Sequence, residues 1–233
     1  MVLAVSFLFT GCMTAEKSKI FRETPAALVS VVSNGDINWK GEEATNLSLV
    51  SRSIRRSMEE DPDLGVITAA DTLIGDIETL IMAALNSSPQ IMMAPRTTVT
   101  GSRSYNQAAV NVHQEKTGMA KPADFRFINY RDKKFMSGFA AETGVNKFIF
   151  VTLDLTKTMS SGFGKLGNCR ATIAMSVMIR NDRGKTLFNK KYEIPSRDQT
   201  KVSNGMYSQH ELRQMIMSAI GDACSQFLDD ITY

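Results

Sequence analysis

The 233-residue sequence has few of the residues that build metal and catalytic centres: it contains two histidines and three cysteines, far apart along the chain. None of them has the C-x-x-C or H-x-x-x-H spacing of a zinc site, so we predict no metal and no cofactor. Paired carboxylates on an apolar background and a nucleophile elbow are also missing, which argues against an enzyme. The net charge of +3 comes with no basic stripe interleaved with aromatic residues, so we expect no nucleic-acid binding.

The sequence also lacks an apolar run long enough to span a bilayer. Residues 2–10 are apolar over the length of a signal-peptide core, and Gly11, Cys12 and a polar stretch follow them. Residues 8–12 (LFTGC) resemble a bacterial lipobox, in which small residues precede a cysteine that is acylated and becomes the N-terminus. Phe9 stands where leucine is usual, and no Lys or Arg precedes the run, which is consistent with an internal start at Met1. The alternative is a buried N-terminal strand with a chance Gly-Cys pair.

The lipobox resemblance implies a domain organisation and a location. Residues 1–11 would be a lipoprotein signal peptide, residues 12–25 a tether, and residues 26–233 a single α/β domain with a polar insertion at about 96–124. Acyl chains on Cys12, palmitate among them, would anchor the protein in the bacterial envelope, in the outer membrane facing the periplasm. Three acyl chains, at about 0.8 kcal/mol per buried methylene, would make this anchoring effectively permanent.

The pattern of apolar residues predicts an α/β (α+β) fold: a mixed sheet with a C-terminal β-hairpin, covered by helices and ending in a long amphipathic helix. The hairpin turn is expected at residues 181–184 (NDRG), since these residue types tolerate positive φ. Strands are predicted at residues 26–33, 90–94, 147–155, 170–179 and 185–194. Helices are predicted at residues 46–58, 71–86 with Asp71 as N-cap, about 125–142 with Gly144 as C-cap, and 207–231.

Two polar segments are the predicted contact surface for a partner. Residues 96–124 are rich in Thr, Ser, Gly, Asn and Gln and indicate a long loop or a loosely packed insertion around a weak helix, while residues 156–168 indicate a flexible connection between strands. The latter contains a G-x-G-x-x-G match at 162–167, but a strand follows it where a dinucleotide site needs a helix. The candidate partner-binding residues are Arg103, Tyr105, His113, Phe163 and Lys165.

Two of the three cysteines lie in predicted core elements. Cys169 begins a strand, and Cys224 lies on the apolar stripe of the last helix. In an oxidising envelope compartment they could form a disulfide, and two buried free thiols are the equal alternative. The 14 methionines should mostly fill the core, while a fraction could line an adaptable apolar groove.

The order of elements resembles that of one group of bacterial envelope domains. The resemblance lies in the helix, glycine turn and strand at 140–149 (AAETGVNKFI) and in the hairpin at 177–191. The chain is similar here to the α/β domain shared by the curli secretion lipoprotein, the lipoprotein activator of a penicillin-binding protein and the N-terminal domain of the Tol translocation protein. This resemblance implies a non-enzymatic domain that binds or helps assemble other envelope components, protein or glycan, and that can form oligomers. The alternative, from the methionine pattern, is a periplasmic carrier of a lipid or hydrophobic ligand, and hydrolase activity is third.

Overall fold

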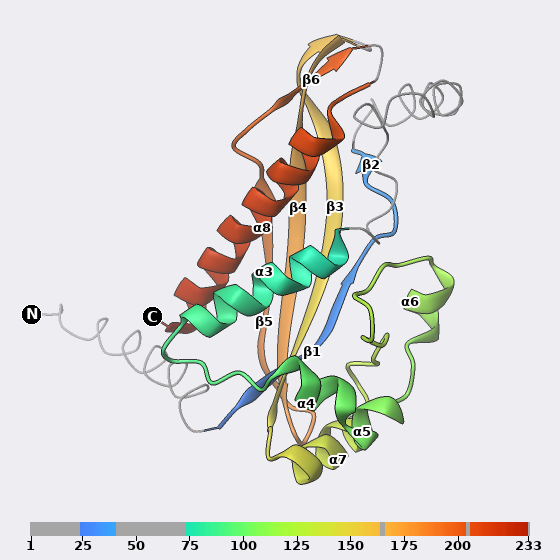
Figure 1. The fold of residues 1–233 in the computed structure, drawn as a ribbon, viewed down its shortest axis with the longest axis vertical. Coiled ribbons are helices and arrows are strands. Elements are labelled where there is room, and N and C mark those ends of the chain that lie inside the picture. Colours follow the sequence, from blue (N-terminus) through green and yellow to red (C-terminus); the bar gives the residue numbers. More distant parts are fainter. Residues whose placement is uncertain (1–23, 41–72, 164–165, 204–205, 233) are drawn as a thin grey trace, which may run out of the picture.

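The computed structural model describes residues 24–40, 73–163, 166–203 and 206–232 (Figure 1). The predicted signal peptide, Cys12 and the predicted helix 46–58 lie outside the described residues. Within the described residues the predicted fold class is confirmed, because helices cover a mixed sheet and the chain ends in a long helix, α8 (Gln209–Thr232).

A six-stranded mixed sheet forms the centre of the fold, with the strand order β1-β3-β4-β5. β1 runs parallel to β3, whereas β3, β4 and β5 are antiparallel neighbours; β2 also pairs with β3, and β6 with β4. The strands are β1 (Ala26–Ser33), β2 (Asn38–Trp39), β3 (Lys147–Phe163), β4 (Leu166–Asn181), β5 (Thr186–Pro195) and β6 (Thr200–Ser203). The predicted strand 26–33 and the C-terminal hairpin are therefore confirmed.

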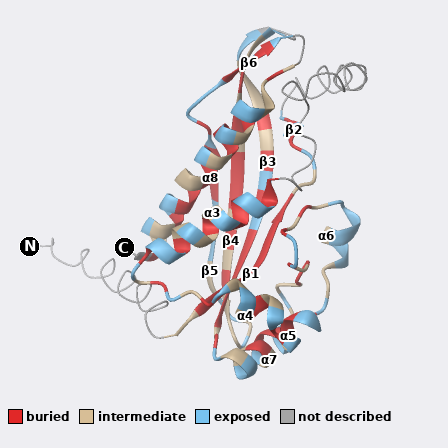
Figure 2. Ribbon diagram, viewed as in Figure 1, coloured by how far each residue is buried: buried red, intermediate tan, exposed pale blue. Residues whose placement is uncertain are grey.

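Helices cover the two faces of this sheet unequally (Figures 1 and 2). The remaining helices are α3 (Ile74–Ser87), α4 (Arg96–Gly101), α5 (Arg103–Asn106), α6 (Val112–Lys116) and α7 (Lys133–Thr143). α3 and α8 enclose the larger core with odd-numbered residues of β3 and β4, such as Ile149, Val151 and Val177. α4, α5 and α7 enclose a second core against Phe148 and Phe150 on the other face. None of the residues of α6 is buried.

The predicted flexible connection at 156–168 is wrong, since β3 and β4 continue as one long hairpin. Cross-strand pairing runs from Lys147 and Asn181 to Phe163 and Leu166. The glycines that suggested a loop are required by this pairing: a Cβ on Gly162 would lie 2.2 Å from the Leu166 carbonyl oxygen. Only glycine allows backbones to approach so closely at a φ of 108°. The G-x-G-x-x-G match is thus a feature of strand pairing.

The polar stretch 96–124 also differs from the prediction of a loose insertion. It holds α4, α5 and α6, and Val99, Tyr105 and Ala108 are buried in the second core. Two short polar side chains make this possible: Ser102 accepts from the Tyr105 N–H, and Asn111 accepts from the Gln114 N–H, each at a helix N-terminus. A few buried residues and two caps therefore order a stretch whose average composition is that of a loop.

Three element boundaries also differ from the sequence prediction. α3 begins after Leu73, which is its N-cap and makes no side-chain capping bond, and the predicted N-cap Asp71 lies outside the described residues. The predicted strand 90–94 is reduced to a bridge, in which the Ala26 N–H donates to the Met92 oxygen at 2.8 Å. α7 starts only at Lys133, because the Asp132 carboxylate accepts from the Phe135 N–H at 2.9 Å and caps it. The predicted Gly144 C-cap is confirmed, with a φ of 76°.

Candidate functional site

The sheet face opposite α3 and α8 changes character along β3. Phe148 and Phe150 are buried under the second core, whereas Thr152 and Asp154 on the same face are exposed. Because side chains alternate along a strand, the cross-strand neighbours of these residues share this uncovered region. We call it the open face: Thr152, Asp154, Thr156 and Thr158 of β3, Arg170, Thr172 and Ser176 of β4, and Lys191 and Glu193 of β5. Apart from Ala174, the buried cross-strand neighbour of Asp154 and Glu193, this face is polar, and no helix among the described residues covers it (Figure 2).

A groove of about 540 Å³ lies where the covered half of this face meets the open face. Three segments form it: the stretch that follows β1, α6 with the turn behind it, and the middle of β3. Its polar and apolar walls include Asn34, Asp36, His113, Met119, Thr152 and Asp154. Of the predicted partner-binding residues, the structure places only His113 in this groove.

The walls of the groove are held by bonds between distant parts of the chain. The Asn34 amide pairs with the Leu155 backbone like a strand residue, accepting from its N–H at 2.7 Å and donating to its oxygen at 2.8 Å. Ser33 and Ala120 exchange two backbone hydrogen bonds of 2.9 Å, which attach the segment behind α6 to the end of β1. A Cβ on Gly35 would lie 2.2 Å from the Gly118 oxygen, so this contact requires glycine. The groove is therefore preformed.

The electrostatic character of the groove is acidic. Asp36 and Asp154 are exposed, and among the described residues their carboxylates form no ion pair or hydrogen bond. Two cations interact electrostatically with these carboxylates, Lys157 with Asp36 and Lys40 with Asp154. The Lys157 ammonium is buried and donates to the Ile37 oxygen. The Lys40 ammonium lies 2.8 Å from the Glu193 carboxylate. This hydrogen bond lowers the pKa of Glu193 and raises that of Lys40. Two carboxylates are thus left facing solvent beside a polar strand surface.

The other predicted contact residues lie elsewhere. Tyr105 is fully buried: its hydroxyl donates to the Val29 oxygen at 3.2 Å and accepts from the Arg126 N–H at 2.9 Å. Burial raises the pKa of Tyr105 to about 12. Tyr105 is therefore a core residue, and its assignment to a contact surface is corrected. Arg103 is exposed on α5, outside the groove. The Phe163 side chain and Lys165 lie outside the described residues.

Sequence reasoning missed Asp36, Asp154 and Asn34. The predicted strand 26–33 stops short of residues 34–36, and Asp154 lies inside the predicted strand 147–155 with no further role. The available signal was Asp154 itself, a carboxylate in a strand whose alternate residues are apolar. An exposed position in such a strand indicates that one face of the sheet meets water.

The two cysteines are buried free thiols in the structure, which is the second of the alternatives left open by the sequence. Cys169 is on β4 and pairs with Thr200 of β6. Cys224 lies beside Met175 and Val177, which are at least six residues beyond Cys169 along β4. At about 3.3 Å per residue, the two positions along β4 are about 20 Å apart, too far for a disulfide. Burial raises the pKa of Cys169 to about 11 and that of Cys224 to about 12, so neither is an activated nucleophile.

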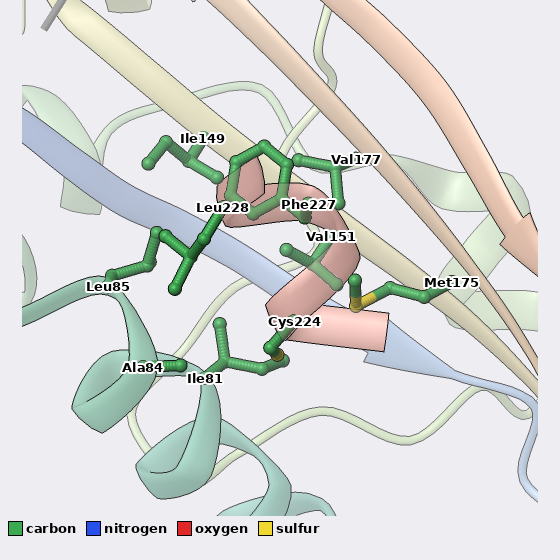
Figure 3. A pocket seen from close by; sticks show the side chains of 10 residues that line it. All are labelled: Ile81, Ala84, Leu85, Ile149, Val151, Met175, Val177, Cys224, Phe227 and Leu228. Atoms are coloured by element: carbon green, nitrogen blue, oxygen red, sulfur yellow. The ribbon is translucent and has the colours of Figure 1, made fainter. Parts of the chain in front are cut away.

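The apolar cavity between α3, α8 and the sheet is small. Ten side chains from α3, α8, β3 and β4 converge on it (Figure 3), and they leave a cavity of about 10 Å³. That is room for about one water molecule. In the described residues, no three His, Cys, Asp or Glu side chains are grouped so as to hold a metal ion. No helix in the described ranges combines the length and apolarity needed to cross a bilayer.

No family model and no curated protein sequence matches the chain. Three solved structures align with most of it. The C-terminal domain of LpoB from Salmonella enterica is 10% identical, with 81% of this chain and 98% of that one covered and a TM-score of 0.30. The lipoprotein GNA1162 from Neisseria meningitidis is 13% identical, covering 87% and 99%, with a TM-score of 0.33. A hypothetical protein from Chlamydia trachomatis is 7% identical, covering 90% and 93%, with a TM-score of 0.40. At these TM-scores the alignments assign no family and no function to the chain.

Proposed function

We propose that the chain is a non-enzymatic, lipid-anchored protein of the bacterial envelope that binds another envelope protein through the acidic groove. The observation that carries the binding proposal is the preformed groove with two exposed carboxylates, Asp36 and Asp154, that form no ion pair or hydrogen bond within the described residues. The anchor is inferred from the apolar run and Cys12 at the N-terminus. Anchoring would restrict the search for a partner to one surface.

The chemistry of the groove favours a basic, partly apolar protein segment as its ligand. A Lys or Arg side chain can form charge-assisted hydrogen bonds with Asp36 and Asp154. Met119 lines the same groove, is partly exposed and offers apolar contact. The threonine hydroxyls of the open face lie beside it and can bind the polar backbone of an extended segment.

The carrier alternative needs an apolar cavity of several hundred cubic ångströms. The cavity between α3, α8 and the sheet holds about 10 Å³, and methionines such as Met175 fill the space around it. The apolar space between α3, α8 and the sheet, which the methionine pattern suggested as a ligand site, is therefore too small to hold a lipid.

The anchor predicts a specific labelling result. When cells expressing the chain are grown with a labelled fatty acid, the wild-type protein should incorporate label and Cys12→Ala should incorporate none, because the acylated thiol is missing. The control is Cys169→Ala with Cys224→Ala, which leaves Cys12 in place and should retain the label. Equal label in wild type and Cys12→Ala would rule out the anchor.

The groove predicts a loss of binding on charge removal. A photoreactive residue at the exposed rim position Thr117 should crosslink one main envelope protein, whereas the same residue at Ser225, on the exposed side of α8, should not. With that partner purified, Asp36→Asn with Asp154→Asn should weaken binding about a hundredfold, since each charge-assisted bond contributes about 1.5–3 kcal/mol.

The matched control for this variant is Glu115→Gln with Asp229→Asn, which removes the same charge from exposed positions outside the groove. It should bind the partner within about twofold of the wild type, as expected for peripheral surface charges. If both double variants bind equally well, the groove is not the binding site.

A further inference from the structure

One end of the sheet brings together the start of the described chain and two basic segments. Ala26 of β1 pairs with Lys147 of β3, which pairs with Asn181 of β4, so β1 and β3 begin where β4 ends. The turn from β4 to β5 lies at this end, and the start of α7 packs against it. In Figure 1 the blue start of β1, α7 and the turn all lie at the lower end of the molecule.

This end carries a cluster of cations, which we call the basic end: Arg131, Lys133, Lys134, Arg180, Arg183 and Lys185. The two segments are in direct contact. The guanidinium groups of Arg131 and Arg180 lie 5.5 and 5.3 Å from the centre of the Tyr130 ring. A Cβ on Gly184 would lie 2.8 Å from the Lys133 Cγ. The turn and the start of α7 thus form one surface.

The positive charge of the basic end is not neutralised locally. The same two segments contain two carboxylates, Asp132 and Asp182, against six cations. Asp132 is engaged by two backbone N–H groups, those of Phe135 at 2.9 Å and Ala109 at 3.0 Å. None of the six cations belongs to an ion pair within the described residues. The six cations outnumber the two carboxylates of these segments by more than the net charge of the whole chain, which is +3.

The N-terminal segment leaves the domain at the same end. Thr24 is fixed there: the Lys147 ammonium donates to its backbone oxygen at 3.0 Å, and its hydroxyl donates to the Asn146 side chain at 2.6 Å. Cys12 precedes Thr24 by twelve residues, which span about 40 Å at most when fully extended. Met92, 60% exposed, lies beside this exit, since its oxygen accepts from the Ala26 N–H. An anchor at Cys12 therefore keeps the basic end within reach of the bilayer.

We infer that the basic end docks on an anionic phospholipid surface and orients the domain on the membrane. This inference rests on the proposed anchor at Cys12. Each Lys or Arg near an anionic bilayer strengthens binding about fivefold, and an acyl anchor combined with a basic patch is a stable membrane attachment. The end of the sheet where β4 pairs with β6 lies at the opposite end of the molecule from the basic end (Figure 1). Docking of the basic end would therefore turn β6 and its part of β4 away from the bilayer.

The test uses the full chain with Cys12→Ala, so that acylation does not contribute. Its binding to vesicles of phosphatidylcholine with 30% phosphatidylglycerol is compared with binding to pure phosphatidylcholine by flotation. We expect clearly tighter binding to the anionic vesicles, which is lost at 1 M salt because the Debye length falls to about 3 Å. Adding Lys134→Ser, Arg183→Ser and Lys185→Ser, three exposed cations of the basic end, should weaken anionic binding about a hundredfold.

The matched control replaces Lys116, Lys191 and Lys201 by Ser, which removes the same charge from exposed positions elsewhere and should change binding no more than about tenfold. Arg183→Glu alone, in the exposed turn, should weaken binding at least tenfold and serves if the triple variant fails to fold. Equal losses in both triple variants, or equal binding to neutral and anionic vesicles, would overturn the inference. Since the tested protein is unacylated, these outcomes are independent of whether Cys12 accepts lipid.

Discussion

Phe148→Ala is expected to lower the free energy of unfolding by about 4 kcal/mol, the size typical of a fully buried aromatic residue. Phe148 is 0% exposed and lies at the centre of the second core. The centres of the Phe135 and Phe139 rings are each 5.7 Å from that of Phe148. Removing its ring leaves a cavity between β3 and α7 that neither rigid element can close. Urea unfolding followed by circular dichroism measures the change.

The matched control is Phe188→Ala on the edge strand β5. Phe188 is only half-buried and contacts one aromatic ring, that of Phe227, at 5.6 Å. Its loss should cost less than half as much as the loss of Phe148, because water can fill the space that the ring leaves. If both variants lower the free energy of unfolding by the same amount, burial of Phe148 in the second core contributes no more to stability than the half-buried Phe188.

The elements predicted correctly are those whose signals are local. Residues 147–155 are rich in β-branched and aromatic residues, with apolar residues at every odd position from 149 to 155, and Gly144 comes shortly before that strand. The last helix has an unbroken apolar stripe, and Ser208 stands at its start as a local capping signal, with the Glu211 N–H donating to the Ser208 hydroxyl at 3.2 Å. Periodicity and capping depend on neighbouring residues only, so one sequence suffices to recognise them.

The wrong predictions concern elements that depend on distant contacts. Residues 156–163 form a strand because residues 166–172 pair with them, and no local pattern records that pairing. Residues 96–124 fold because a few side chains such as Tyr105 reach a core made by β1 and β3. Tertiary packing overrides a polar average composition in both cases.

The candidate site was predictable only in part for the same reason. His113 was recognised as a polar residue with no role in the core. Its neighbours in the groove, Asp36 and Asp154, are 77 and 41 residues away along the chain. Parallel pairing of β1 with β3 brings the Asp36 and Asp154 segments together, and the Ser33–Ala120 backbone bonds attach the segment that follows His113. Neither pairing can be read from residue types alone.

Lys157 is expected to make the stability of the protein rise with pH between pH 7 and pH 9.5. Its side chain is 2% exposed, and its ammonium donates to the Ile37 oxygen and lies 5.2 Å from the ring centres of both Trp39 and Tyr207. Burial lowers the pKa of Lys157 from 10.5 to about 8. Above pH 8 the folded chain therefore releases a proton that the unfolded chain still holds, and this linkage favours the folded state as pH rises.

The expected size of this effect is about 2 kcal/mol over that range, at about 1.4 kcal/mol per pKa unit. The neighbouring Cys169 thiol acts in the opposite direction above pH 9, because its pKa is raised to about 11 and the unfolded thiol ionises first. The Lys157 contribution is therefore measured as the difference between wild type and Lys157→Met in urea unfolding at several pH values. Wild type should gain about 2 kcal/mol relative to the variant from pH 7 to pH 9.5.

The control for the pH profile is Lys191→Met, since this side chain is exposed on the open face and its ammonium is hydrated in the folded and unfolded chains alike. Its stability profile should run parallel to that of the wild type. If the Lys157→Met profile also runs parallel, Lys157 does not lose its proton on folding at these pH values, and its two aromatic neighbours must then hold the charged form. A gain of the expected size would instead show that burial outweighs the contacts with both rings. The segment that carries Ile37 and Trp39 would then be held less tightly at pH 7 than at pH 9.5, and with it the adjoining wall of the groove at Asp36.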